Sequence, residues 1–579
     1  MKLDLQTGSR SRILAILILF IMAIFVVRLF YLQIIEHGKY VAMANSEQLK
    51  RLTIPATRGE IYAMDGTTPV KLVLNQTVYT VFADPHVATD DAKIIDTIRR
   101  VAGGNAQPNL DGLLKNKDSR YEILAKGVTR AQAEMIKKEN LSGVGFQAQS
   151  QRVYPEGQLA SQVLGFVNND GVGQYGVEGA LNDQLKGTDG LLQSVTDVNN
   201  VPLTIGNKNI DKPAVNGQNI ALTIDRNIQS YTEQALAAGL KRTGATNGSV
   251  LVMDPQTGKV LAMANLPTYD PSHYGDVQDA ADYLNDTVSV PYEAGSVIKS
   301  LTVATGIDKG VITPQSTYDN KGTIDVDGTT IQNASLTEVL GTQTMQTALT
   351  WSLNTGMVTV AERLGDGSNI TKQARDTIYH YFHDEFGFGQ LTGIELAGES
   401  PGNIISPDDP DGGAVRYSNM VFGQGMDVTM IQTASAFSSL LDGGVYHYPT
   451  VVEGTVGGDD SLTEAAPKPT KQVIKKTTAD QVRQMLVIDR HDNGASDTPG
   501  YTIGGKTGTS QALINGKYVF NQTTGSYLGF GGDDTPRYVI MVQVSGKNMA
   551  LGGAADAGPI FTDISNWMLS YLKLAPKAQ

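Results

Sequence analysis

An unbroken apolar segment near the N-terminus constrains the architecture of this chain most. Fifteen uncharged residues, 13–27, lie between Arg12 and Arg28. At ~1.5 Å per residue, a helix of that length covers about 22 Å of a hydrocarbon core that is roughly 30 Å thick. If Arg28 reaches toward the interface and residues 29–32 continue the helix, roughly 20 residues cross the bilayer. The sequence therefore predicts one transmembrane helix over residues 13–32.

The residues around this segment predict its orientation. Three basic residues precede it, namely Lys2, Arg10 and Arg12. Because positively charged flanks stay in the cytoplasm, we expect residues 1–12 to form a cytoplasmic tail and the bulk of the chain to be extracytoplasmic. A cleaved signal peptide is the alternative, but bulky side chains occupy the expected cleavage region, namely Phe25, Val27 and Leu29. No later stretch approaches about 18 apolar residues, which predicts a single-pass protein.

The composition is that of a folded protein with more than one domain. The chain has 579 residues, with 41% hydrophobic and 18% charged residues, and is too long for one typical core. Its net charge of −13 leaves no basic excess to neutralise phosphates, which excludes a general nucleic-acid binder. The absence of cysteine excludes disulfides and thiolate chemistry.

The segment after the apolar run mixes short strands and helices. Residues 76–85 are strand-like, residues 90–103 are helix-like, and glycines punctuate the whole region. Thr129 and Gln132 have the spacing of a capping box, which predicts a helix start there. We expect this mixed segment to end near residue 225.

Beyond residue 226 the pattern changes. Residues 248–267 and residues 525–546 each contain two apolar strands joined by a turn, which predicts two hairpins. Helical patterns lie between them, for example at residues 477–492. Strands at both ends and helices in the middle predict an α+β domain whose sheet is assembled from both ends of the segment.

A serine and a lysine three residues apart are the first candidates for chemistry. In PYEAGSVIKSL, Ser296 follows Gly295 and precedes Lys299, and the apolar spacing predicts a helix that ends at Gly310. Ser296 would lie in the first turn, where free N–H groups and the helix dipole favour an oxyanion. Lysine acts as a base only when desolvation or a neighbouring cation lowers its pKa from about 10.4. Taken alone, this pattern is a weak signal that arises often by chance, and it favours an N-capping serine over a nucleophile.

Two partner motifs favour the catalytic interpretation. S-x-x-K, S-x-N and K-T-G occur together in enzymes that form an acyl-serine. Here the second motif supplies Ser352 and Asn354, and the third supplies Lys506, Thr507, Gly508 and Thr509. Each of these residues also has an ordinary structural interpretation, as a helix cap or as a turn into a strand. Three motifs in the expected order make that interpretation improbable for the set.

The residue types predict a role for each group. Ser352 can relay a proton between Lys299 and a leaving amine, and Asn354 can orient Lys299 or hold a substrate amide. Lys506 can lower the pKa of Lys299 and attract a substrate carboxylate. Three neighbours complete this strand: Thr507 and Thr509 as hydrogen-bond donors to that carboxylate, and Gly508 as a point of close approach. The backbone N–H groups of Ser296 and Thr509 are the predicted oxyanion hole.

With these motifs the chain resembles the class B penicillin-binding proteins, monofunctional peptidoglycan D,D-transpeptidases of the division or elongation type. The resemblance covers nearly the whole sequence, including TRGEIYAMDG, SQRVYPEGQLASQVLGFVN, YGVEGALNDQLKGTDG, TIDRNIQ, TGIELAGE and FGQGMDVTMIQTASAFSSL. Arg58 and Gly59, Arg152 and residues 176–178 match the pedestal region of that family. Residues 423–425 match a stretch beside its active site.

The resemblance implies a complete architecture. After the tail and the anchor, residues 33–225 would form an elongated pedestal, or dimerisation-like, domain. Residues 226–575 would form a penicillin-binding, serine β-lactamase-like transpeptidase domain. Four positions depart from the family pattern without removing a catalytic group, namely Ala63, Met64, Ala294 and Leu353.

The resemblance also implies an activity, substrates and partners. Ser296 would be acylated by a D-Ala-D-Ala stem peptide of peptidoglycan or of its lipid-linked precursor, and by β-lactams, with no cofactor and no metal. The enzyme would lie in the bacterial cell membrane. Its partners would be a polytopic glycosyltransferase and other division or elongation proteins. We lean to division, because no domain follows the last hairpin.

Several other functions compete with this one. A β-lactamase is disfavoured because no E-x-x-L-N segment lies between Ser352 and Lys506. A D,D-carboxypeptidase with the same serine and lysine stays open as an alternative, as does a non-enzymatic division scaffold or β-lactam sensor. A bifunctional enzyme is disfavoured because residues 40–225 lack the paired acidic motif of a glycosyltransferase. His380 and His383 are interpreted as helix-surface residues and not as metal ligands.

Overall fold

The computed structural model describes residues 9–40, 49–195, 210–514 and 517–577. Residues 1–8 of the predicted cytoplasmic tail, Lys2 among them, lie outside this part. The chain forms two compact units, one of Met1–Thr57 with Lys186–Gly217 and one of Arg58–Leu185 with Gln218–Gln579.

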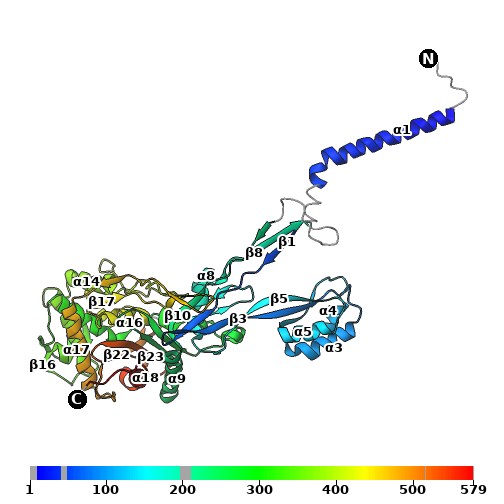
Figure 1. Ribbon diagram of the computed structural model, residues 1–579. Helices are drawn as coiled ribbons and strands as arrows, with labels where there is room; N and C mark the ends of the chain where they lie inside the picture. The colour runs from blue at the N-terminus through cyan, green and yellow to red at the C-terminus, as the bar shows by residue number, and fades with distance from the viewer. Residues whose placement is uncertain (1–8, 41–48, 196–209, 515–516, 578–579) are drawn as a thin grey trace. The chain divides into compact units, whose positions relative to one another are not determined.

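The first unit begins with the predicted apolar helix. Helix α1 spans Ser9–Phe30 and continues as the π-helical turn η1, Tyr31–Ile35 (Figure 1). Its segment Arg12–Ile35 is long and apolar enough to cross a membrane. The expected helix over residues 13–32 is therefore confirmed, and it extends three residues further. The same unit contains a three-stranded sheet in the order β1 (Leu49–Ile54), β8 (Gly190–Val195) and β9 (Ile210–Lys212).

The second unit contains a seven-stranded sheet that draws on distant parts of the chain. The strand order is β19-β18-β10-β2-β3-β4, and β5 also pairs with β3. Their bounds are Ile61–Asp65 (β2), Thr68–Ala83 (β3), Glu122–Thr129 (β4), Val144–Val153 (β5), Asn219–Asp225 (β10), Val452–Val456 (β18) and Leu462–Glu464 (β19). Strand β10 runs parallel to β2 and antiparallel to β18, so one sheet joins residues that are more than 200 positions apart.

A small helical layer covers the far half of β3 (Figure 1). Helices α3 (Asp91–Ala102), α4 (Leu110–Lys115) and α5 (Arg130–Lys138) pack with β3, β4 and β5 around a separate apolar core. The strand and the helix expected at residues 76–85 and 90–103 are both confirmed. So is the capping box, because Thr129 Oγ1 accepts a hydrogen bond from Gln132 N, and Gln132 Oε1 accepts one from Thr129 N.

A buried ion network contacts strand β3 at Asn75. The Glu178 side chain, on helix α7 (Gly176–Ala180), is fully buried between two arginines. Arg58 Nε donates to Glu178 Oε2 at 2.8 Å, and Arg152 Nε donates to Glu178 Oε1 at 2.6 Å. Arg152 also donates to Asn75 Oδ1 at 2.9 Å, so the network ties α7 to β3 and β5. An unpaired charge in this position would be costly, which explains why both carboxylate oxygens are paired.

The second sheet of this unit is antiparallel, in the order β12-β11-β23-β22-β21. Its strands are Asn247–Met253 (β11), Val260–Leu266 (β12), Thr502–Ile514 (β21), Lys517–Gly532 (β22) and Pro536–Ser545 (β23). Both predicted hairpins are confirmed as β11–β12 and β22–β23. They meet at the centre of the sheet, where Val250 lies opposite Val542, so the sheet is built from both ends of the segment as expected.

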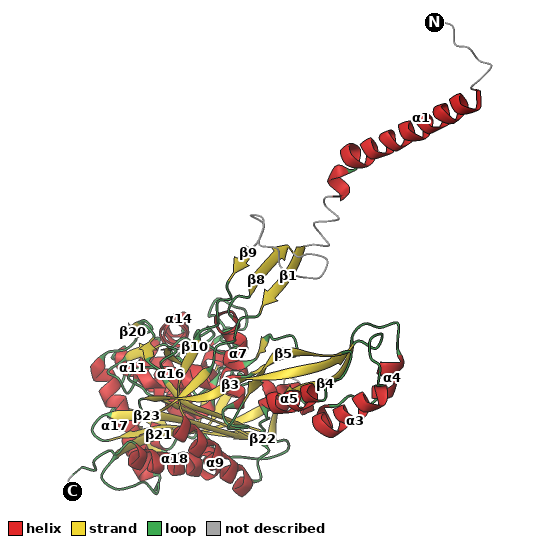
Figure 2. Ribbon diagram, turned by 45° about the vertical axis from the view of Figure 1, so that its right-hand side comes forward, coloured by secondary structure: helices red, strands yellow, loops and turns green. Residues whose placement is uncertain are grey.

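Helices cover both faces of this sheet. Helices α9 (Arg226–Thr243) and α18 (Gly558–Tyr571) lie side by side on one face (Figure 2). The other face packs against the large core that holds α11 (Lys299–Asp308), α16 (Met430–Ser439) and α17 (Lys476–Asp492). Helix α17 confirms the helix expected at residues 477–492. The α+β fold class of this segment is confirmed.

The turn from β10 into α9 lies at the predicted domain boundary. Asp225 caps α9 by accepting hydrogen bonds from Asn227 N and Ile228 N. Its carboxylate also accepts from Gly66 N and from Tyr571 Oη. The turn is thus tied both to the β2–β3 connection and to the last helix. The boundary between residues 225 and 226, like the other predicted domain limits, stays a prediction.

Candidate active site

The turn that carries Ser296 is held by two glycines. Gly295 has a φ of +63°, and its amide donates to Gly423 O at 2.9 Å. A Cβ atom on Gly295 would lie only 2.7 Å from Thr509 O, so the turn is pressed against strand β21. Ser296 lies in a 3₁₀ turn, η5 (Gly295–Ile298), and α11 begins only at Lys299. The expected α-helical first turn is therefore wound more tightly, because Gly295 takes a left-handed conformation that does not belong to a helix.

The backbone angles explain the predicted end of this helix and the presence of alanine, in place of the usual proline, at position 294. Gly310 follows α11 with a φ of +74°, as a helix-ending glycine does. Ala294 has a φ of −70°, close to the value that a proline ring enforces. Alanine therefore follows the same backbone path here as the proline usual in the family.

Lys299 is fully buried and makes three short contacts. Its Nζ lies 2.6 Å from Ser352 O, 3.1 Å from Ser352 Oγ and 2.7 Å from Asn354 Oδ1. Burial holds the pKa of Lys299 well below its usual value, the charge of Lys506 lowers that pKa further, and Asp489 opposes both effects. Lys299 therefore has the environment of a neutral amine, which is the form that can accept a proton.

Ser352 lies at the junction between two helices. It follows α12 (Met345–Thr350), precedes α13 (Asn354–Leu364) and has a φ of +54°, which is uncommon for a residue other than glycine. Strained backbone of this kind clusters at functional sites. The next residue, Leu353, is buried in the core, so the departure from serine at this position adds packing and takes nothing from the polar set. Asn354 Nδ2 donates to Gln332 O at 2.8 Å, which fixes the amide so that its oxygen faces Lys299.

Strand β21 forms the opposite wall and is an edge strand of the sheet. The Lys506 side chain is 1% exposed, and its Nζ lies 3.2 Å from Thr507 Oγ1. A Cβ atom on Gly508 would lie 2.9 Å from Ala294 O, so only glycine lets this strand meet the Ser296 turn. Thr509 is exposed at the same place, and its Oγ1 accepts a hydrogen bond from Gly553 N at 3.3 Å.

The structure thus brings the predicted residues together to different degrees. Lys299, Ser352 and Asn354 are joined by direct hydrogen bonds. Lys506 is close enough to act on Lys299 through its charge. The Ser296 turn contacts the backbone of Thr509. The roles of these residues in catalysis, and those of the Ser296 and Thr509 amides, stay predictions.

Besides the Gly295–Gly423 hydrogen bond, a second tether holds the residues just before Ser296, and it was not predicted. Glu293 is buried, and its Oε1 accepts hydrogen bonds from Gly425 N at 2.6 Å and from Tyr518 Oη at 2.8 Å. Burial raises the pKa of Glu293. The contact ties strand β22 and the Gly423–Gly425 loop to the residues just before Ser296. No local pattern predicts it, because Tyr518 lies more than 200 residues from Glu293.

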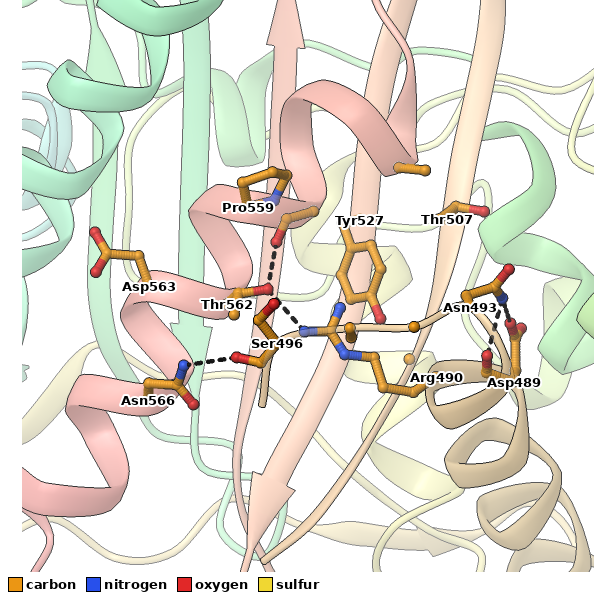
Figure 3. Close-up of a pocket in the computed structure, with 15 residues that line it drawn as sticks. Asp489, Arg490, Asn493, Ser496, Thr507, Tyr527, Pro559, Thr562, Asp563 and Asn566 are labelled. Carbon is orange, nitrogen blue, oxygen red and sulfur yellow. Dashed lines mark hydrogen bonds between the residues drawn. The ribbon is translucent and has the colours of Figure 1, made fainter. Parts of the chain in front are cut away.

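Sequence reasoning also missed Asp489. This residue is on α17, one turn beyond Met485 and Leu486 on the apolar face, and its carboxylate lies 3.6 Å from Lys506 Nζ. An acidic residue in an apolar stripe is the signal that would have found it. Asp489 also lines a pocket of about 480 Å³ on the α18 side of β21 (Figure 3). Other lining residues drawn there are Arg490, Asn493, Thr507, Tyr527 and Thr562.

Comparison with known proteins identifies the family. The penicillin binding protein transpeptidase domain family matches residues 248–566, and the penicillin-binding protein dimerisation domain family matches residues 53–222. The chain belongs to the class B penicillin-binding proteins. In this penicillin-binding protein the first match contains all three motifs that are predicted to form the active site, and the second contains Arg58, Arg152 and Glu178.

Related penicillin-binding proteins match along nearly their full length. Stage V sporulation protein D of Bacillus subtilis is 30% identical, over 98% of this chain and 87% of that protein. Penicillin-binding protein PbpB of Mycobacterium tuberculosis is 31% identical, over 95% of this chain and 83% of that one. The protein named probable peptidoglycan D,D-transpeptidase PbpC in Pseudomonas aeruginosa is 27% identical, over 98% and 96%.

Solved structures of penicillin-binding proteins share the fold. Penicillin binding protein 3 of Mycobacterium tuberculosis, complexed with aztreonam, has a TM-score of 0.67 and 26% identity, covering 91% of this chain and 100% of that chain. A peptidoglycan synthetase of Bifidobacterium adolescentis has a TM-score of 0.71 and 26% identity, covering 92% and 98%. The expected architecture, with a serine β-lactamase-like transpeptidase domain, is therefore confirmed for this penicillin-binding protein.

Proposed function

We propose that this protein is a serine-type peptidoglycan D,D-transpeptidase that forms an acyl-enzyme on Ser296. The observation that carries the proposal is the position of Lys299. A fully buried lysine, with its pKa held well below the usual value, is hydrogen-bonded to Ser352 and Asn354 one helical turn from Ser296. The name of the Pseudomonas aeruginosa relative supports the same reaction.

Acylation follows from this arrangement. Lys299, as the neutral amine, accepts the proton of Ser296 Oγ while that oxygen attacks the carbonyl carbon of the penultimate D-Ala. The peptide C–N bond then breaks, and the terminal D-Ala leaves with a proton that passes from Lys299 through Ser352 Oγ, 3.1 Å away. The product is an ester between Ser296 and the shortened stem peptide.

Deacylation completes the transfer. An amine from a neighbouring stem peptide attacks the ester carbonyl, forms an amide bond to it and gives up a proton to Lys299. The ester C–O bond breaks, and Lys299 returns the proton to the Ser296 oxygen. The backbone N–H groups of Ser296 and Thr509 stabilise the negative oxygen in both steps. A β-lactam acylates the same serine, and its ester is released slowly.

Recognition of the substrate carboxylate is assigned to β21. Lys506 supplies the positive charge, and Thr507 and Thr509 supply hydroxyl donors. Gly508 keeps this strand against the Ser296 turn, because an added Cβ would meet Ala294 O and Ser526 Oγ.

The same proposal places the protein at the cell surface. Helix α1 anchors it as a single-pass protein with the N-terminus in the cytoplasm, and the catalytic domain acts outside the membrane on stem peptides. A polytopic glycosyltransferase of the division machinery is the proposed partner. Imaging a fluorescent fusion during growth tests the division role, because lateral and not septal signal would assign the protein to elongation.

Covalent labelling tests the chemistry. The purified protein should gain the mass of one fluorescent penicillin, and Ser296→Ala should gain none. Ser300→Ala is a matched control, because within the described part of the chain that nearby hydroxyl bonds only to Val297 O, and it should be labelled like the wild type. Equal labelling of the Ser296→Ala variant would show that Ser296 is not the nucleophile. Incubation with cross-linkable precursor then separates the alternatives, because a carboxypeptidase yields hydrolysed stems and a transpeptidase yields dimers.

A further inference from the structure

A buried carboxylate faces one of the two active-site lysines. Asp489 Oδ2 lies 3.6 Å from Lys506 Nζ, and the two side chains are 3% and 1% exposed. Asp489 Oδ1 accepts a hydrogen bond from Asn493 Nδ2 at 2.5 Å. Among the residues that the structure describes, Oδ2 has no hydrogen-bond partner and only the ion pair with Lys506.

This placement needs an explanation beyond packing. The neighbouring positions on the same face of α17 are apolar and buried, among them Val482, Met485 and Leu486. An apolar residue at position 489 would continue that face without the cost of desolvating a charge. A buried ion pair is weak evidence for a gain in stability. We therefore look for the function of Asp489 in its effect on Lys506.

The partner, Lys506, is one of two buried lysines. Protonating both of them at once is unfavourable, because their positive charges repel each other. Lys299 and Lys506 are both buried, and the charge of Lys506 lowers the pKa of Lys299. The mechanism requires opposite states for them, since Lys299 must be neutral to accept a proton and Lys506 must be charged to bind a carboxylate. A counter-ion beside one lysine assigns the charge to that lysine.

We propose that Asp489 is a positioning residue for acyl transfer through Ser296, which rests on the function proposed above: it holds Lys506 in place as the ammonium ion and thereby leaves Lys299 as the neutral base. It touches neither the nucleophile nor the reacting carbonyl. It acts through Lys506, whose Nζ contacts both Asp489 Oδ2 and Thr507 Oγ1.

The charged groups around Asp489 come from several elements. Lys506 on β21 and Asn493 beyond the end of α17 stabilise its ionised form, while Asp492 opposes it. The charge of Asp489 in turn raises the pKa of Lys299 on α11 and that of Tyr527 on β22. Figure 3 shows Asn493 directed at Asp489, and Tyr527 beside them in the same pocket.

The sign of the pH effect follows from these contacts. Burial raises the pKa of Asp489 to about 6. Below that pH the carboxyl group takes up a proton and the ion pair with Lys506 is lost, so Lys506 is no longer held in place and acylation should fall. Above it the carboxylate is charged and lies 3.6 Å from Lys506 Nζ, so acylation should persist to a higher pH than it would without Asp489.

The experiment measures the second-order rate constant for acylation by a penicillin between pH 5 and pH 10. In Asp489→Asn we expect the alkaline limb to move to lower pH, and at a fixed pH on that limb the rate should fall about tenfold for each pH unit by which the limb moves. Asp480→Asn is the matched control, since Asp480 pairs with Lys476 on the surface of the same helix. Its profile should equal that of the wild type. An unshifted alkaline limb in folded Asp489→Asn would overturn the proposal.

A second variant keeps the test decisive if Asp489→Asn does not fold. Asn493→Ala removes an exposed side chain that donates to Asp489 Oδ1, so it should raise the pKa of Asp489 and move the acid limb to higher pH. An acid limb that stays in place counts against the proposal. Asp489→Asn in a Lys506→Met background should add no further loss, and an additive loss would show that Asp489 does not act through Lys506. If the wild type itself is not acylated, the proposed function fails instead.

Discussion

The amide nitrogen of Gly295 donates a 2.9 Å hydrogen bond to the carbonyl oxygen of Gly423. This contact joins the turn before Ser296 to the loop that follows α15 (Ala414–Met420). Gly423 has a φ of +89°, and an added Cβ would lie 2.0 Å from Gly295 O. The position of the nucleophile therefore depends on a residue more than 120 positions away.

Gly423→Ala tests that dependence. The Cβ cannot be accommodated without moving the Gly295 carbonyl, and the positive φ adds strain of about 1–3 kcal/mol. We expect the acylation rate by a penicillin to fall by about tenfold or more. Gly413→Ala is the control, because a Cβ added to Gly413 would meet open space and its φ is negative, and it should keep the wild-type rate. A Gly423→Ala protein that is acylated normally would show that the contact does not position Ser296.

Asn354→Asp tests the protonation state of Lys299. A carboxylate in place of the amide oxygen, 2.7 Å from Nζ, favours the ammonium form and raises the pKa of Lys299. The neutral fraction then falls, so the acid limb of the acylation profile should move to higher pH. At a fixed pH on that limb, the rate should fall about tenfold for each pH unit by which the limb moves. Rates measured from pH 5 to pH 10 check this, and a limb that moves to lower pH would contradict the assignment of Lys299 as base.

Glu178→Gln tests the buried ion network that Glu178 forms with Arg58 and Arg152. Removing the charge leaves Arg58 and Arg152 uncompensated, and breaking a buried network in this way costs about 3–5 kcal/mol. Urea unfolding should show that loss. Glu60→Gln is the control, because Glu60 pairs with the exposed Lys71 and should change the unfolding free energy by less than about 1 kcal/mol. Equal effects of the two variants would mean that the network adds nothing beyond a surface pair.

Tyr518→Phe tests the second tether of the Ser296 turn. The variant removes the hydroxyl that donates to Glu293 Oε1 at 2.8 Å, and of the described residues Gly425 N is then the one remaining donor to this buried carboxylate. We expect a loss of about 1–3 kcal/mol in unfolding free energy and a severalfold slower acylation. Tyr121→Phe, whose exposed hydroxyl bonds to Gln147, should leave both quantities unchanged. Unaltered acylation in Tyr518→Phe would show that this contact contributes to folding stability and does not position Ser296.

The sequence predicted the local elements of this fold well, because their signals are local. The two hairpins follow from alternating apolar residues and turn sequences, and α17 follows from the spacing of its apolar face. The pairing of β10 with β18 was not predicted, since nothing near Asn219 specifies a partner at Val456. Register between distant strands depends on the whole fold.

In the candidate site, too, the residues with local signals were predicted and those placed by long-range contacts were not. Ser296, Lys299, Ser352, Asn354 and Lys506 were found because each belongs to a short motif with a fixed spacing. Asp489 and Glu293 belong to no motif, and only the folded chain places them beside Lys506 and the Ser296 turn. The 3₁₀ geometry at Ser296 was missed for a related reason, because the left-handed Gly295 before it contacts Gly423 and Thr509, which lie far along the chain.

The mixed sheet of the second unit decides how the chain can be shortened. A fragment that began at Arg226 would keep β18 but lose β10, its partner in that sheet. The bare edge of β18 would then be free to pair with another molecule and promote aggregation. A soluble fragment for crystallisation or inhibitor screening should therefore retain residues 58–185 and 218–225 together with the catalytic segment.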